Sequence, residues 1–141
     1  MSKYFENLNG RCRNKVAQRL EFESITALLN WLTEINILRN RCAHHARIWN
    51  HETANPVSVT GLDNNPYFQR LDLSPESRKK IYGRICVIWY LVKKIGLSST
   101  WINKVADLVD SKPNIDCCPF TAMGLPDNNG FPRELFEIQP R

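Results

Sequence analysis

The chain has 141 residues, of which 43% are hydrophobic and 23% are charged. This length and composition are typical of one globular domain, and they exclude a mainly disordered chain. The 19 Lys and Arg residues outnumber the 14 Asp and Glu residues, giving a formal net charge of +5. The longest apolar run, residues 85–92, is too short to cross a bilayer, so we expect no contact with a membrane.

Five cysteines at irregular spacings, with no preceding signal peptide, predict a protein of the reducing cytoplasm. We expect no disulfide framework, because the number is odd and Cys117 and Cys118 are adjacent.

The N-terminal half predicts one long helix after two short helical stretches. Residues 1–8 form the first stretch, which Asn9 and Gly10 end, and residues 13–20 add one or two amphipathic turns. Ser24 can then cap a helix whose apolar residues recur every three or four positions, namely Ile25, Leu28, Leu29, Leu32, Ile35, Leu38 and Cys42. The residues that follow Leu38 are expected on this helix or on its last turns.

The C-terminal half predicts a loop, two more helices and an irregular tail. Pro and Gly residues make residues 53–73 a loop. A second long helix begins at Ser74 and Pro75 and ends at Gly96. Ser98 or Ser99 caps a third, which Pro113 ends and whose inner stripe is Ile102, Val105, Leu108 and Val109. The fold class is therefore all-α, with the tail lying on the helical bundle.

No acidic residue occurs between Glu76 and Asp107, whereas seven basic residues do: Arg78, Lys79, Lys80, Arg84, Lys93, Lys94 and Lys104. Such a field can bind the phosphates of a nucleic acid. It can equally be a solvated helix face balanced by the acidic tail, and charge alone favours this second interpretation.

All three histidines lie at residues 44, 45 and 51. On a helix, Arg39, Asn40, Ala43, His44 and Arg47 share one polar arc, because each residue advances about 100°. Leu38, Cys42 and His45 fall on the apolar side. We therefore expect His45 to be a packed structural residue and His44 to be presented with Arg39 and Asn40.

A zinc site and a Cys–His nucleophile are both disfavoured, because Cys42 points away from His44 and no CxxC or HxxxH pair occurs. What remains is an imidazole, a guanidinium and an amide, with no cofactor expected. These groups suit cleavage of an RNA phosphodiester: the imidazole takes the 2′-hydroxyl proton and the guanidinium holds the phosphate.

The string LRNRCAHHARIWN, residues 38–50, resembles the signature of the Abi-like (AbiD/AbiF-type) proteins of bacterial abortive infection, which belong to the HEPN nucleases. Their motif is an arginine, a polar residue and a histidine after a short gap, which Arg39, Asn40 and His44 match. Residues 29–32, 89–91 and 123–126 are similar to the same family's C-terminal half. The resemblance implies one HEPN-like bundle over residues 1–141 that is completed by dimerisation. Family chains usually carry a longer segment before this region than the sequence has here.

The resemblance also implies a metal-independent endoribonuclease acting in phage defence or as a toxin. Two copies would form a composite site, with Arg39 and His44 as principal catalytic residues and Asn40 in support. Expected RNA contacts are Arg41, Arg47, Arg78, Lys79, Lys80 and Arg84, and expected structural residues near the site are His45, Trp49 as a core anchor and Asn50 as a helix-ending residue. Its partners would be RNA, a second copy, and a structured noncoding RNA or a partner subunit.

Two alternatives stay open. The same basic residues could hold RNA without cutting it, as a regulatory module of a defence complex, and residues 39–50 could serve only for capping and packing.

Overall fold

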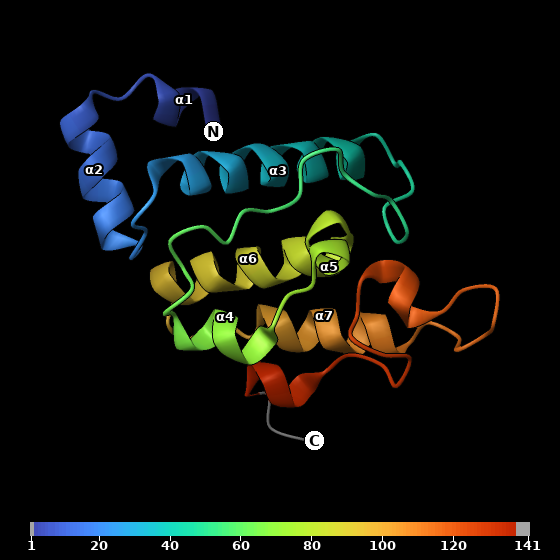
Figure 1. Ribbon diagram of the computed structural model, residues 1–141. Coiled ribbons are helices and arrows are strands. Elements are labelled where there is room, and N and C mark those ends of the chain that lie inside the picture. The colour runs from blue at the N-terminus through green and yellow to red at the C-terminus, as the bar shows by residue number, and fades with distance from the viewer. Residues whose placement is uncertain (1, 138–141) are drawn as a thin grey trace.

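The computed structural model describes residues 2–137, which form α-helices and two 3₁₀ turns without a strand (Figure 1). The α-helices are α1 (Ser2–Glu6), α2 (Gly10–Arg19), α3 (Ile25–Ala43), α4 (Pro66–Leu71), α5 (Pro75–Lys79), α6 (Ile81–Ile95) and α7 (Trp101–Asp110), and the turns are η1 (Phe120–Met123) and η2 (Arg133–Phe136). The predicted all-α class is confirmed. In Figure 1, α3 lies over α6, which lies over α4 and α7, while α1 and α2 flank the start of α3.

The second and third helices begin at side-chain caps. Asn9 Oδ1 accepts a hydrogen bond from the Cys12 N–H at 2.9 Å, so Asn9 starts α2 as well as ending the preceding turn. Ser24 Oγ accepts from the Ala27 N–H at 3.3 Å, and α3 begins there as predicted. These bonds satisfy amide groups that the first turn of a helix leaves without partners.

The predicted loop at residues 53–73 is wrong in its second part, because α4 lies within it. Asn65 Oδ1 accepts from the Tyr67 N–H at 3.0 Å, and Pro66 occupies the first helical position. This pair starts a helix as well as a turn. Burial of Phe68 and Leu71 then anchors the short helix on the core.

The second predicted long helix is wrong as one unit, because the chain breaks between α5 and α6. Lys80 is extended, with φ −108° and ψ 176°. The carbonyl oxygens of Lys79 and Arg78 accept hydrogen bonds from the amides of Thr53 and Val57, at 2.9 and 3.0 Å. The incoming loop thus takes up carbonyls that a continuous helix would have bonded internally.

Glycine at position 83 permits the tight corner between α5 and α6. A Cβ atom placed there would come within 2.5 Å of the Ser77 carbonyl oxygen and 2.9 Å of Arg78 Cα. Both atoms belong to the backbone of α5, so a side chain at position 83 would force the two helices apart. The corner fixes where α6 begins.

An aromatic cluster forms the centre of the core. Trp31 is fully buried and lies edge-on to Phe22 and Tyr90, with ring centroids 4.6 and 5.6 Å away. Its Nε1–H donates to the Ser58 carbonyl at 2.6 Å, which ties the loop after α3 to the same helix. Phe68 of α4 completes the cluster at 5.6 Å from Trp31.

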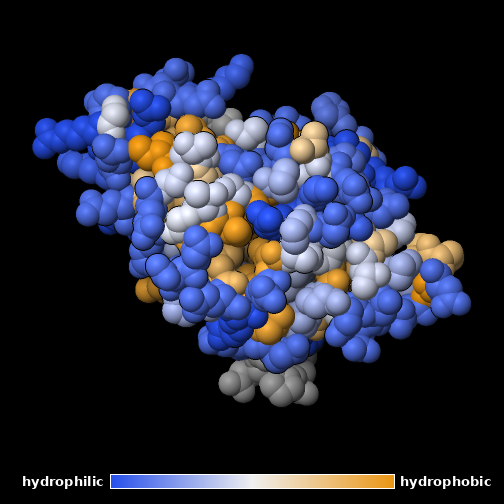
Figure 2. Space-filling model, in the orientation of Figure 1, coloured by the Kyte–Doolittle hydropathy of each residue, from blue (hydrophilic) through white to orange (hydrophobic). Residues whose placement is uncertain are grey.

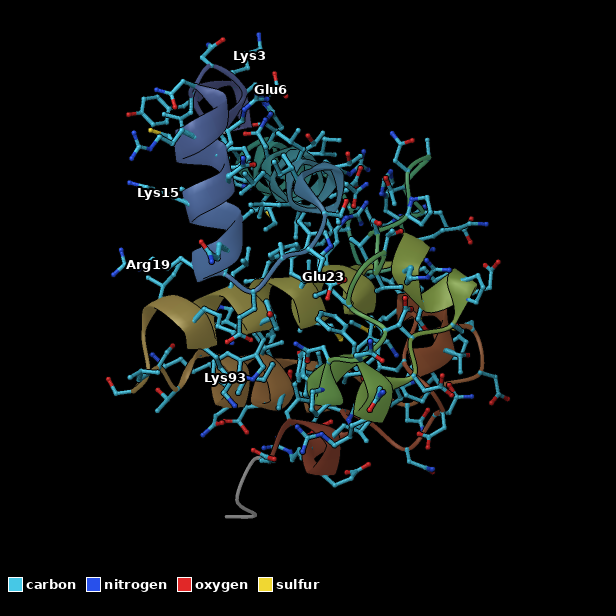
Figure 3. The ribbon with its side chains drawn as sticks, turned by 60° about the vertical axis from the view of Figure 1, so that its left-hand side comes forward. Lys3, Glu6, Lys15, Arg19, Glu23 and Lys93 are labelled. Carbon is cyan, nitrogen blue, oxygen red and sulfur yellow. The ribbon has the colours of Figure 1, made fainter. Side chains whose placement is uncertain are left out.

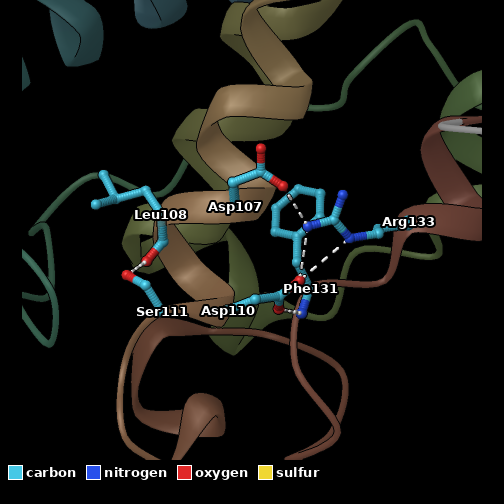
Figure 4. A network of polar contacts seen from close by, with 6 residues as sticks. All are labelled: Asp107, Leu108, Asp110, Ser111, Phe131 and Arg133. Carbon is cyan, nitrogen blue, oxygen red and sulfur yellow. Dashed lines mark hydrogen bonds and ion pairs between the residues drawn. The ribbon is translucent and has the colours of Figure 1, made fainter. Parts of the chain in front are cut away.

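The tail lies on the bundle, as predicted, and buries Phe120, Met123, Leu125, Phe131 and Phe136. Figure 4 shows how it is fastened to α7: Arg133 Nη2 lies 2.9 Å from both Asp107 Oδ1 and Asp110 Oδ2. Asp110 Oδ1 also accepts the Phe131 N–H at 2.8 Å.

Leu108, predicted on the inner stripe of α7, is 72% exposed, so that assignment is wrong. Its neighbour Val109 is buried together with Ile102 and Ala106. The buried stripe of this short helix is therefore narrower than predicted. In the described part of the chain, none of the helices has the length and apolar character needed to span a membrane.

Candidate functional site

The motif segment lies where α3 ends. The last helical residue is Ala43, and His44 is the cap, with its N–H donating to the Asn40 carbonyl at 3.1 Å. His45 follows in the left-handed region, with φ +52°, and turns the chain away from the helix axis. Arg39 and Asn40 therefore occupy the last helical turn, while His44 stands at its edge.

Arg39, Asn40 and His44 are all exposed. Arg39 Nη1 donates to Asn40 Oδ1 at 2.9 Å, so the amide holds one side of the guanidinium. Within residues 2–137, the imidazole of His44 makes no hydrogen bond or ion pair, and the other guanidinium nitrogens of Arg39 are equally uncommitted. The helix end thus presents a free imidazole one residue beyond the turn that carries an oriented guanidinium.

The predicted packing of His45 is wrong. Its side chain is exposed, and so is that of Cys42. The helical projection fails for His45 because α3 has already ended at Ala43 and the backbone has turned to positive φ. Asn50 does not end the helix either, since it lies seven residues beyond Ala43. Trp49 is half-buried and packs against the core, as expected of an anchor.

A polar pocket of about 500 Å³ lies beside the helix end, lined by Arg41, Arg47, Asn50, His51 and Glu52. Arg41 Nη2 donates to the Arg47 carbonyl at 3.1 Å, which folds the segment after α3 back onto the helix. Sequence reasoning left His51 out of the site, although its position directly after the motif was a usable signal.

His51 is held away from its charged form. Its Nδ1 is buried and has no hydrogen-bond partner. Burial is the largest cause that lowers its pKa from 6.5, followed by the positive charges of Arg41 and Arg84, while Glu34 opposes them. An imidazole with a lowered pKa is neutral at pH 7 and can accept a proton.

Arg84 is only 1% exposed, so the RNA contact predicted for it is wrong. Its Nη2 lies 3.2 Å from Glu34 Oε2, and Glu34 is fully buried in the middle of α3. Thr53 Oγ1 donates to the same carboxylate oxygen at 2.8 Å. Sequence reasoning could not find this pair, because the two residues lie 50 positions apart.

The other predicted basic contacts lie next to the pocket segment. Lys80 Nζ is 3.7 Å from Glu52 Oε1, and the Lys79 carbonyl accepts the Thr53 N–H. Arg78 and Lys79 are half-buried, and Lys79 Nζ also lies 3.6 Å from Glu76 Oε1. The fold thus brings the end of α5 to the segment that follows the motif, as the paths of the two segments in Figure 1 also show.

Over residues 2–137, no three His, Cys, Asp or Glu side chains come together as a metal site would require. The chemistry that the described residues offer at the helix end is proton transfer by histidine and anion binding by arginine.

Residues 1–50 match a family whose description is Abi-like protein. The match covers about a third of the chain and ends at Asn50, so it includes Arg39, Asn40 and His44. No curated protein and no solved structure matches the chain significantly. The N-terminal third is therefore similar to Abi-like proteins, and this similarity reaches the candidate site.

Proposed function

We propose that the chain is a metal-independent endoribonuclease of the abortive-infection or toxin type within the HEPN superfamily, with Arg39, Asn40 and His44 as catalytic residues. The observation that carries the proposal is that one helix end presents the exposed, uncommitted imidazole of His44 and a guanidinium, that of Arg39, which Asn40 Oδ1 holds at 2.9 Å. The similarity of residues 1–50 to Abi-like proteins supports a role in phage defence.

The reaction needs an acceptor for the 2′-hydroxyl proton and a cation for the phosphate. His44 Nε2 or Nδ1 takes the proton, the 2′-oxygen bonds to phosphorus, and the bond from phosphorus to the 5′-oxygen breaks. The products are a 2′,3′-cyclic phosphate and a 5′-hydroxyl. Arg39 binds the phosphate as negative charge grows on its oxygens.

A homodimer supplies what one copy lacks. The leaving 5′-oxygen must receive a proton. When both proton transfers occur together, one histidine accepts the 2′-hydroxyl proton while a second, protonated histidine donates to the leaving oxygen. A second copy related by a two-fold axis provides another His44 and another Arg39. Their exposure at the helix end lets two copies approach a single phosphate.

The basic residues around the pocket bind the RNA phosphates that lie next to the cleaved one. We assign this role to Arg41 and Arg47, together with Arg78, Lys79 and Lys80 at the end of α5. Arg84 is excluded from it by burial.

The test is cleavage of a defined RNA by the purified chain in the presence of EDTA. His44→Ala and Arg39→Ala are each expected to reduce the cleavage rate by about a hundredfold or more, because each removes a transition-state contact. His45→Asn is the matched control, since it changes an adjacent exposed histidine and asparagine tolerates positive φ. Circular dichroism verifies folding, and end analysis must find the cyclic phosphate. Equal cleavage by all four proteins would refute the assignment.

A second candidate is an RNA-binding module that does not cut, in which the pocket arginines hold phosphates. The observation in its favour is that the pocket lies beside His51 and does not include His44. It predicts salt-sensitive binding of RNA that Arg41→Gln and Arg47→Gln weaken, with intact RNA recovered from the wild-type complex. Cyclic phosphate ends on that RNA would decide for the enzyme.

A further inference from the structure

An apolar groove of about 610 Å³ opens between α2, α3 and α6. Its lining includes Val16 from α2 and Leu20 directly after it, Leu32 and Ile35 from α3, and Leu91 and Ile95 from α6. Apart from Gly96 and Ser99, every lining residue is aliphatic. No element among residues 2–137 fills this aliphatic groove.

The groove is open to solvent along α2 and at the end of α6. Ile95 is 79% exposed, and Val16 is also exposed at the opposite wall. In Figure 2, apolar side chains show among hydrophilic ones on the side of the molecule where α2 and the end of α6 lie. An aliphatic depression that is open to solvent can receive apolar side chains of a partner.

The helices that form the walls carry almost only positive charge. Neither α2 nor α6 contains an acidic residue, and the one acid of α3, Glu34, is buried against Arg84. The basic residues of α2 are Arg11, Arg13, Lys15 and Arg19, and those at the end of α6 are Lys93 and Lys94. Figure 3 shows the side chains of Lys15 and Arg19 extending from α2 away from the body of the molecule, with Lys93 below them. Of these, Lys94 is paired with Glu21 at 2.6 Å.

We propose that this groove binds an amphipathic helix of a partner protein, with an aliphatic stripe and acidic flanks. An aliphatic stripe at positions i, i+3, i+4 and i+7 matches a groove between helices. Glutamates beside the stripe meet the lysines and arginines of α2 and α6. The proposal is independent of RNA cleavage, because His44 does not line the groove.

Charge and lining decide against the other occupants. A second copy seated in the groove by its own groove face would bring two basic rims together, which like-charge repulsion opposes. Single-stranded nucleic acid binds to aromatic platforms on which bases stack, and the lining of this groove contains no aromatic residue.

The probe is a fluorescein-labelled synthetic helix of about 18 residues, with leucine at the stripe positions and glutamate at the flanks. Fluorescence anisotropy with the full chain is expected to show saturable binding that weakens as salt is added. Ile95→Gln and Val16→Gln are each expected to weaken binding about tenfold, because they place an amide in the apolar contact. Leu108→Gln is the matched control for Ile95→Gln, since Leu108 is an aliphatic residue of similar exposure that lies outside the groove.

The charge requirement has its own pair of variants. Lys15→Glu combined with Arg19→Glu is expected to weaken binding about tenfold, whereas Lys104→Glu on α7 leaves it unchanged. A peptide with lysine in place of glutamate, and a scrambled peptide of equal composition, are expected not to bind.

Four outcomes overturn the proposal. These are equal affinity of the lysine and glutamate peptides, unchanged binding by Ile95→Gln, no binding of the glutamate peptide at about 100 μM, and self-association of the chain that Ile95→Gln abolishes in sedimentation velocity. The last would make a second copy the occupant. His44→Ala is expected to bind the peptide normally, so failure of the nuclease proposal would leave this test unaffected.

Discussion

The middle and the end of α3 place their charged residues in opposite surroundings. Glu34 is fully buried and shared by Arg84 and Thr53, whereas Arg39, little more than one turn later, is exposed and bonded only to Asn40. A buried pair has to stay in place, because either charge alone would be costly in the core. A guanidinium at an exposed helix end can exchange water for a phosphate. One helix thus carries a buried ion pair in its middle and exposed, weakly held polar side chains at its end.

Removing Arg84 should break this comparison most strongly. Arg84→Ala leaves Glu34 charged and unpaired in the core, so we expect a loss of about 3–5 kcal/mol in the free energy of unfolding. Arg39→Ala, the matched exposed arginine, should change it by less than about 0.5 kcal/mol. Urea unfolding followed by circular dichroism measures both. Similar losses for the two variants would mean that the pair is not buried in solution.

A double substitution sharpens the same point. Glu34→Leu with Arg84→Met removes both charges and keeps apolar volume, so its stability should return to within about 1–2 kcal/mol of the wild type. A loss that equals the sum of the single effects would argue against coupling between the two side chains.

The corner before α6 is the next test, because it sets where Arg84 enters the core. Gly83→Ala puts a methyl group 2.5 Å from the Ser77 carbonyl oxygen, so we expect a loss of about 1–3 kcal/mol. Gly10→Ala is the control, since nothing lies within 4 Å of a Cβ atom there. Thermal unfolding should separate the two variants, and equal melting temperatures would contradict the close contact between α5 and α6.

The ion pairs of Arg133 are intermediate in exposure between the buried Glu34–Arg84 pair and the exposed Arg39. The Arg133 guanidinium contacts both Asp107 and Asp110 but remains partly open to water. Arg133→Ala should therefore cost only about 1 kcal/mol, and less at 1 M NaCl, because exposed ion pairs are weak and screened. Urea unfolding at two salt concentrations measures this. A loss as large as that of Arg84→Ala would remove the distinction between buried and exposed pairs.

His51 should give the smallest effect, and it reports on both regions. Its pKa is lowered in the folded state, so the unfolded chain binds more protons as the pH falls below 6.5. The lowered pKa of His51 therefore has no effect on the free energy of unfolding at high pH. It reduces that free energy as the pH falls from 6.5 towards the pKa of the folded state. NMR titration should place the His51 pKa below 6.5. Arg41→Gln should raise it and Lys104→Gln should not; a value at or above 6.5 in the wild type would contradict the burial.

Local signals in the sequence predicted a good part of this structure. Ser24 and the apolar spacing after it place α3, and Gly96 marks the end of α6. The sequence did not predict the break at Lys80, and this has a physical cause. The hydrogen bonds that interrupt the helix come from Thr53 and Val57, which lie far away in the chain. Local periodicity carries no information about such partners.

The same division holds at the candidate site. The position of Arg39, Asn40 and His44 near the helix end followed from the sequence, and their catalytic role stays a prediction. The burial of Arg84 could not be predicted, because its acidic partner, Glu34, belongs to another helix and lies outside the acid-free stretch of sequence around Arg84. His45 was misplaced because periodicity cannot tell on which residue a helix stops.

The left-handed backbone at His45 makes this residue a joint between the helix end and the segment with Arg47 and His51. Glycine, asparagine and aspartate adopt such a conformation at little cost, whereas valine, isoleucine and proline do not. The backbone conformation at position 45 therefore restricts which residues can replace His45, even though its side chain is exposed and lies outside the core.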